Sequence, residues 1–128
     1  MANVPDDLLY TDDHEYIRTN GDANVVTIGI TDYAQGELGD VVFINLPKVG
    51  DEFTAHQAFG TIEAVKAVAD LFAPVAGVVV EVNTALDADP AVVNSDPYGA
   101  GWMIQLKINV ADLSGLLTAD AYRTHIGG

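Results

Sequence analysis

Few residues in this sequence have the types and the spacing that chemistry requires. Cysteine is absent, which excludes disulfides, thiolate metal sites and a cysteine nucleophile. Any redox reaction would therefore depend on sulfur supplied by an attached group. The histidines, His14, His56 and His125, do not lie at the spacing of metal ligands, and no glycine-rich phosphate loop is present. The chain offers no pairing of a nucleophile with a base, so its residues do not indicate an enzyme.

Lysine is scarce, which makes the position of each lysine informative. Lys48 follows a proline at an expected turn, and Lys107 falls on the polar side of an expected strand. Both positions are typical of solvated surface residues. Lys66 has a carboxylate on either side, at Glu63 and Asp70. An isolated lysine of this kind is usually an ordinary surface residue, so the surrounding segment has to decide whether it does more.

The net charge limits what the chain binds. Nineteen acidic residues stand against five basic ones, for a formal charge of −14 and a pI near 4.1. Nucleic acids and anionic lipids bind through Lys and Arg, so neither is an expected partner, whereas basic patches of other proteins are. The N-terminus has no signal or transit pattern, and no apolar run reaches the roughly 20 residues of a membrane span. We expect a cytoplasmic protein; adaptation to high salt is an open alternative reason for the acidity.

Turn and cap signals divide the first third of the chain. A hairpin is predicted over 16–30, with its turn at Asn20-Gly21-Asp22, because this sequence favours tight hairpin turns. A short helix is predicted over 32–38. Thr31 has the side chain of an N-cap residue, and Gly39 suits the end of the helix.

The rest of the chain alternates apolar runs with turn residues. Strands are predicted over 41–46, 77–82 and 102–108, and the leucine spacing predicts a C-terminal helix over about 113–126. The length is that of one domain, 1–128. Short strands with Gly and Pro turns indicate a mostly β fold, an antiparallel sandwich or flattened barrel with short helices at its margins.

One segment is ambiguous by local rules. Residues 63–73 are rich in helix formers and place Val65, Val68 and Phe72 at helical spacing, so taken alone they predict a helix. They also lack the glycine that a tight turn prefers. Helix propensity is a weak guide that tertiary context often overrides, and the wider pattern described next favours a hairpin.

The segment Val49–Asn83 resembles the lipoyl and biotinyl domains. It has a Val-Gly-Asp turn, a strand that ends in Glu63, a Lys-Ala pair, and an Ala-Pro-x-x-Gly-x-x-x-Glu-Val strand. In those domains the lysine stands at the exposed tip of a hairpin, within a core that here would span about 41–83. The resemblance therefore implies a hairpin with Lys66 at its tip, where a long flexible stem on a rigid support suits an acylated amine.

The neighbours of the lysine narrow the resemblance to one family. Biotin carriers have Met on both sides of the lysine, and lipoyl domains of 2-oxo acid dehydrogenases usually have Asp before it. Here Val65-Lys66-Ala67, preceded by Glu63, is similar to the glycine cleavage H-protein family. Further blocks match this family in order and spacing: Tyr10, His14–Tyr16, Ile28–Gln35, Gly39–Phe43, Leu46–Pro47 and Asp96–Trp102. The departures, which bear on partner contacts, are Tyr16, Asn45, Lys48 and Ala64.

The resemblance implies a carrier and not an enzyme. Lys66 would carry lipoate, attached by a lipoate ligase or an octanoyl/lipoyl transferase that recognises the flanking Glu63. Glycine decarboxylase (P protein) would load the aminomethyl group of glycine, an aminomethyltransferase (T protein) would unload it, and dihydrolipoamide dehydrogenase (L protein) would reoxidise the arm. We expect a monomer. The alternative is a relay that donates lipoyl groups to other lipoyl-dependent enzymes.

The resemblance also implies a cleft that shelters the loaded arm. The carried group is a cationic amine, so carboxylates should line the cleft. By position, Glu15 and Asp70 match the family's acidic residues, with Asp13 and His14 beside them. We expect Glu15 and Asp70 to hydrogen-bond the ammonium; the alternative is that both are solvated surface carboxylates. His14 would organise the cleft wall or the packing rather than act as an acid or base.

Overall fold

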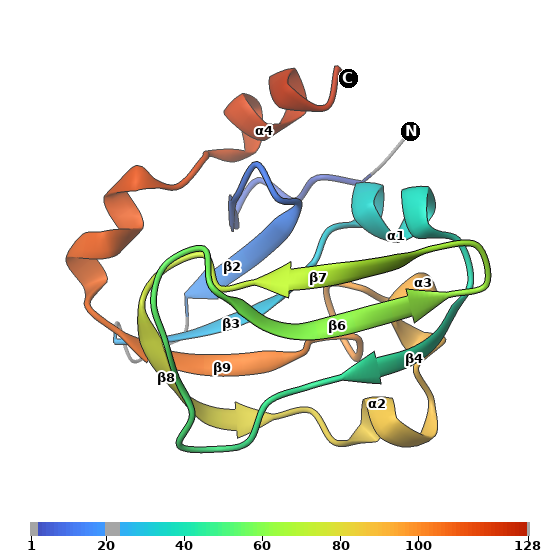
Figure 1. The fold of residues 1–128 in the computed structure, drawn as a ribbon. Coiled ribbons are helices and arrows are strands. Elements are labelled where there is room, and N and C mark those ends of the chain that lie inside the picture. Colours follow the sequence, from blue (N-terminus) through green and yellow to red (C-terminus); the bar gives the residue numbers. More distant parts are fainter. Residues whose placement is uncertain (1–2, 20–23, 128) are drawn as a thin grey trace.

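The computed structural model describes residues 3–19 and 24–127 of the chain. In these ranges short strands predominate, with short helices between and after them (Figure 1). The strands are β1 (Leu9–Tyr10), β2 (Glu15–Thr19), β3 (Val25–Ile30), β4 (Val41–Asn45), β5 (Glu52–Phe53), β6 (Ala58–Ala64), β7 (Val68–Phe72), β8 (Gly77–Val82) and β9 (Ile104–Ile108). The helices are α1 (Asp32–Leu38), α2 (Ala85–Ala88), α3 (Val92–Ser95), the 3₁₀ helix η1 (Val110–Gly115) and α4 (Ala119–His125). No helix in the described ranges is long and apolar enough to cross a membrane.

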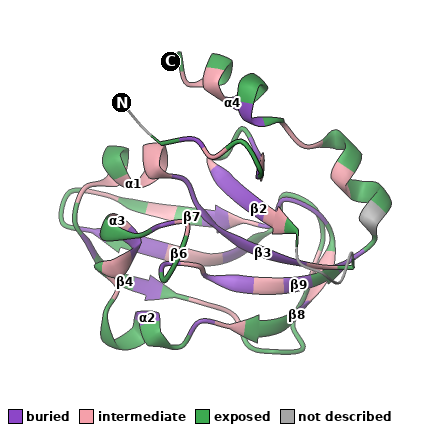
Figure 2. Ribbon diagram, turned by 180° about the vertical axis from the view of Figure 1, so that it is seen from behind, coloured by how far each residue is buried: buried purple, intermediate pink, exposed green. Residues whose placement is uncertain are grey.

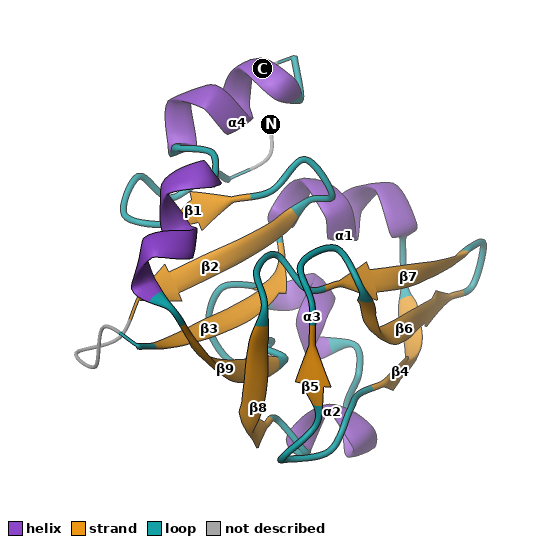
Figure 3. Ribbon diagram, turned by 60° about the vertical axis from the view of Figure 1, so that its left-hand side comes forward, coloured by secondary structure: helices purple, strands orange, loops and turns teal. Residues whose placement is uncertain are grey.

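The strands form two antiparallel sheets. The larger sheet has the order β1-β2-β3-β9-β8-β5, and the smaller has the order β4-β6-β7 (Figure 3). Ile28 and Ile104 of the larger sheet are buried in one cluster with Ile44 and Ile62 of the smaller. The helices lie at the margins, where their residues are exposed or half-buried apart from a few that pack inward (Figure 2). The prediction of a mostly β, antiparallel fold with marginal helices is confirmed.

The elements near the start of the chain match their local signals. β2 and β3 pair antiparallel as the predicted hairpin, although its turn at 20–22 lies outside the described residues. α1 begins after Thr31, whose hydroxyl accepts a hydrogen bond from the Ala34 N–H. It ends at Gly39, which has a φ of 81°. The cap residues and their side-chain chemistry therefore set both ends of this helix.

The segment 63–73 is a hairpin and not a helix, as the wider pattern predicts. β6 and β7 pair antiparallel from Glu63 opposite Val68 to Ala58 opposite Phe72. Their extended backbones bury Ile62 and Leu71 in the core between the sheets. Burial of such a side chain stabilises by about 1.5–3 kcal/mol, whereas helix propensities of ordinary residues differ by less than about 1 kcal/mol. Tertiary burial therefore overrides the local preference.

The prediction of one helix over 113–126 is wrong for its first half. Residues up to Gly115 belong to the 3₁₀ helix η1, and α4 begins only at Ala119, after the N-cap Thr118. Between them Leu117 pairs with Tyr10 of β1 through two backbone hydrogen bonds of 2.8 and 2.9 Å. This pairing requires extended backbone, which interrupts the helix that the leucine spacing predicts. The sequence does not predict α2 and α3 either, which are helices of only four residues each.

Candidate functional site

Lys66 lies in a two-residue turn at the tip of the β6–β7 hairpin. The Ala64 N–H donates to the Ala67 oxygen at 2.7 Å, which leaves Val65 and Lys66 as the loop. Neither loop residue has a positive φ, so the turn is not of the Asn-Gly type that tight hairpins favour. The Val65 N–H instead donates to the Asp40 oxygen at 3.0 Å and anchors the tip to the chain after α1 (Figure 1). Lys66 is therefore exposed on a fixed support.

Gly39 makes room for the stem of Lys66. A Cβ added to Gly39 would lie 3.1 Å from the Lys66 Cε, and the backbone of Gly39 has a φ of 81°. Side chains of L residues rarely adopt this conformation, and the added carbon would press on the lysine. The end of α1 thus lies beside the stem of Lys66 and leaves space for it.

Glu63 is exposed on the outer face of the smaller sheet. In the strand register it lies between Phe43 of β4 and Val68 of β7. Residues directly opposite each other in neighbouring strands share one face of the sheet. The carboxylate is therefore presented to solvent three residues before Lys66, with an apolar neighbour on each side.

Glu15 is buried, with only 2% of its surface exposed, although it carries a carboxyl group. Its Oε1 accepts a hydrogen bond from the Thr11 hydroxyl at 3.1 Å, and its Oε2 accepts one from the Phe72 N–H at 3.2 Å. Burial raises the pKa of Glu15 to about 8; the Phe72 N–H opposes the rise, and nearby Asp13 adds to it. The side chain joins the loop after β1 to the edge of β7.

Asp70 and Asp13 approach the same end of β7 from different segments. Asp70 is exposed on β7, two residues before Phe72, the residue whose N–H binds Glu15. Asp13 Oδ2 lies 4.0 Å from Nδ1 of His56, and the His56 N–H donates to the residue that follows β7. The structure therefore places all three carboxylates near the C-terminal end of β7, one buried and two facing solvent.

His14 faces the C-terminal helix. Its Nδ1 lies 2.9 Å from the Tyr122 hydroxyl, which lies 2.7 Å from the Thr31 hydroxyl. Its ring centroid lies 5.0 Å from that of Tyr33 and 5.6 Å from that of His125. Burial lowers the pKa of His14, and the neighbouring His125 adds to this effect. The side chain of His14 thus holds α4 against the start of α1, through the hydrogen bond between its ring and the Tyr122 hydroxyl of α4.

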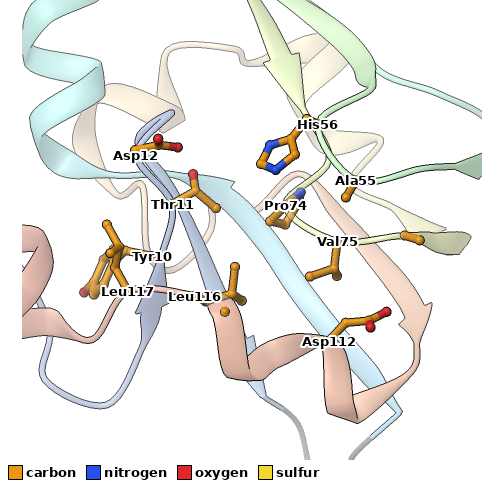
Figure 4. Close-up of a pocket in the computed structure, with 12 residues that line it drawn as sticks. Tyr10, Thr11, Asp12, Ala55, His56, Pro74, Val75, Asp112, Leu116 and Leu117 are labelled. Atoms are coloured by element: carbon orange, nitrogen blue, oxygen red, sulfur yellow. The ribbon is translucent and has the colours of Figure 1, made fainter.

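The sequence does not predict the places of two residues at this end of the molecule, Thr11 and His56. The Thr11 hydroxyl binds Glu15 twice, because it also accepts a hydrogen bond from the Glu15 N–H at 3.2 Å. A threonine at the start of a turn only weakly indicates such hydrogen bonds. The residue type of His56 does not predict its φ of 68°. Both line an open cleft of about 570 Å³, with Val75 and Leu116 among its apolar residues (Figure 4).

Comparison with known proteins identifies the arrangement. The profile of the family described as "Glycine cleavage H-protein" matches residues 8–127. The chain is 56% identical over 126 residues to "Glycine cleavage system H protein" of Chlorobium limicola, covering 98% of each chain. It is 51% identical over 130 residues to the protein of that name from Mycobacterium tuberculosis, covering 96% of each. The crystal structure of a glycine cleavage system H protein from Mycobacterium marinum matches with a TM-score of 0.89 at 43% identity, over 98% of this chain and 100% of that one.

The match extends over nearly the whole length, in sequence and in fold, and is not confined to the hairpin around Lys66. Proteins of this family carry lipoyl-lysine and act as carriers without catalysing a reaction. The chain therefore belongs to the glycine cleavage H-protein family and is a lipoyl carrier of the glycine cleavage system, not an enzyme.

Proposed function

We propose that Lys66 is the residue that carries lipoate. The observation that supports this most directly is its place in a two-residue tip, exposed and anchored to Asp40. The other two lysines do not lie at a protruding tip. Lys107 lies in β9, between the strands β3 and β8 of the larger sheet, and Lys48 lies in the link between β4 and β5. An acylated amine that enters one active site after another needs a flexible stem on a protruding, rigid support, and of the three lysines Lys66 has both.

In the proposed cycle the partner enzymes catalyse the reactions, and this chain positions the lipoyl arm for each of them. When bound, lipoate supplies a disulfide that accepts a one-carbon amine unit together with two electrons. We propose that glycine decarboxylase, aminomethyltransferase and dihydrolipoamide dehydrogenase each meet the tip in turn. The enzyme that attaches lipoate would recognise Glu63, which is exposed three residues before Lys66. The charge of −14 supports docking on basic patches of these proteins.

We propose that Asp70, Asp13 and Glu15 receive the amine of the loaded arm. Asp70 lies four residues from Lys66, about 13 Å along extended chain, and Glu15 binds the strand two residues further on. With a pKa of about 8, Glu15 is mostly protonated at neutral pH, so the solvent-facing carboxylates of Asp70 and Asp13 attract an ammonium first. Charge-assisted hydrogen bonds contribute about 1.5–3 kcal/mol each. A neighbouring ammonium then favours the ionised form of Glu15, so loading should release a proton.

Release of the carried carbon as formaldehyde tests the role of these carboxylates. Asp70→Asn and Glu15→Gln should each release it several-fold faster than wild type, because the ammonium loses a partner. Glu52→Gln changes an exposed carboxylate on β5 and should leave the rate unchanged. Wild-type rates in both Asp70→Asn and Glu15→Gln would rule out this role of the carboxylates and leave the lipoyl site standing.

Glycine–bicarbonate exchange with glycine decarboxylase tests the carrier function of Lys66. Lipoylated wild type should support exchange, and Lys66→Arg should not, because the arginine side chain cannot be acylated by the same enzyme. Lipoylated wild type without exchange would favour the lipoyl relay instead. A cytoplasmic location, a monomeric state and one domain over 1–128 stay predictions, which fractionation, sedimentation and limited proteolysis would check.

A further inference from the structure

Among the residues whose side chains the structure describes, the large apolar ones that remain exposed lie in one region. Their exposed fractions run from 39% to 78%, and they are Val42, Phe43, Val49, Val65, Val68 and Val80. Single exposed apolar residues are common, but a contiguous set marks an interaction surface. We propose that this set, called here the apolar track, is the surface on which glycine decarboxylase docks while it takes up the arm on Lys66. The proposal rests on the carrier function of Lys66 proposed above.

The track begins at the hairpin tip. Val65 forms the turn together with Lys66, and its side chain is 78% exposed. Phe43 and Val68 lie on the outer face of the smaller sheet, one on each side of Glu63. The apolar surface therefore reaches the lysine, and a protein bound along it would hold Lys66 at its edge.

The track continues from the outer face into a groove. This groove has a volume of about 480 Å³, and its apolar lining comes from Phe43, Leu46, Val49, Val80 and Val82. Its walls belong to different sheets, since Phe43 lies in β4 and Val80 in β8. β8 leads into α2, which lies beneath β4 (Figure 1). Phe43 is common to the face and the groove, so it is the centre of the track.

Both strands that border the groove carry a β-bulge at an exposed valine. Val42 is the extra residue of β4 opposite β6, and Val80 is the extra residue of β8 opposite β9. A bulge disrupts the hydrogen-bond ladder and redirects a side chain. Of the two strands, β4 is the edge strand of its sheet, and a bulged edge resists pairing with a further strand. The track therefore suits a partner that binds by packing side chains, and it does not suit one that adds a strand.

The acidic residues around the apolar track indicate which kind of protein surface can bind there. Exposed carboxylates border the track at Asp40, Glu63, Glu81 and Asp87. A complementary surface is apolar at its centre and carries Arg or Lys at its rim. A second copy of this chain, with the same charge of −14, would be repelled. The oxidised arm that glycine decarboxylase receives is uncharged, so charge complementarity in this contact has to come from the protein surface around Lys66.

The test compares two lipoylated variants in glycine–bicarbonate exchange with glycine decarboxylase. Phe43→Ser/Val80→Ser removes the centre of the track, and Ala111→Ser/Ala121→Ser makes exposed apolar-to-serine changes on η1 and α4. We expect the KM for the track variant to rise at least tenfold, with kcat at saturation unchanged and the control at the wild-type KM. The docking surface is refuted if all three proteins share one KM, or if kcat falls while KM does not change.

Further measurements separate docking from folding, self-association and the carrier function. Should the double variant unfold, Val49→Ser, which changes a 64% exposed side chain in a link, should still raise KM about threefold. Sedimentation that shows a wild-type dimer lost in the track variant would assign the surface to a second copy and overturn the proposal. If lipoylated wild type supports no exchange, the proposed function itself fails. If wild type is active and the variant KM is unchanged, only the docking surface fails.

Discussion

Replacing Glu15 by Gln should stabilise the protein relative to wild type by an amount that grows with pH. In the folded chain burial raises the pKa of this carboxyl group to about 8, whereas its ordinary value is 4.5. Between these values the folded chain binds a proton that the unfolded chain lacks. The free energy of unfolding of the wild type therefore falls as pH rises from 4.5 to about 8. This loss of stability is absent below that interval and complete above it.

The size of the effect follows from the width of this interval. Each pKa unit corresponds to about 1.4 kcal/mol, so the interval from 4.5 to about 8 gives a loss on the order of 5 kcal/mol. Gln does not titrate, and its amide suits both partners of Glu15. Its oxygen would accept from the Phe72 N–H, and its NH₂ group would donate to the Thr11 hydroxyl.

Urea unfolding of wild type and Glu15→Gln between about pH 5 and about pH 8 measures this difference. The single tryptophan, Trp102, provides the fluorescence signal. Glu81→Gln, which changes an exposed carboxylate of β8, is the control and should differ from wild type by a constant amount. For Glu15→Gln the difference should grow by several kcal/mol toward high pH. A difference that stays within about 0.5 kcal/mol, or shrinks, would show that Glu15 is ionised in the folded chain.

The remaining predictions concern positions with left-handed backbone. Gly39→Ala should lower stability by about 1 kcal/mol and slow lipoylation, because the methyl group presses on Lys66; calorimetry and a lipoylation time course check this. His56→Gly should raise stability by about 1 kcal/mol, since glycine adopts the φ of 68° without strain. His14→Gly, at a φ of 69°, should lower it, because Tyr122 loses a hydrogen-bond partner. Urea unfolding measures the stability of the two histidine variants. If both changes raise the free energy of unfolding, or both lower it, the predicted difference between the two positions is wrong.

Features with local causes could be predicted from the sequence. Thr31 caps α1 because a threonine hydroxyl can accept from a backbone N–H three residues on, and Gly39 ends it because its φ is 81°. The hairpin around Lys66 could be predicted only from the resemblance of the wider segment. Local propensity favoured a helix there, and the core contacts of Ile62 and Leu71 cannot be read from the residues 63–73 alone.

Features that depend on long-range contacts could not be predicted. The resemblance singles out Glu15 among the nineteen acidic residues, but its burial depends on Phe72, which is 57 positions away in the chain. The late start of α4 depends on the pairing of Leu117 with Tyr10. The grouping of Phe43 and Val80 around one groove likewise depends on strands of different sheets. In each case the determining partner is distant in sequence and carries no local signal.

Peptide-resolved mass spectrometry of the protein after lipoylation tests directly whether Lys66 carries the arm. We expect one lipoyl adduct per chain, confined to the peptide that contains Lys66, and no adduct on Lys66→Arg. An adduct on Lys48 or Lys107, or an unmodified Lys66 in protein that is active in exchange, would contradict the assignment of the carrier arm to the tip of the β6–β7 hairpin.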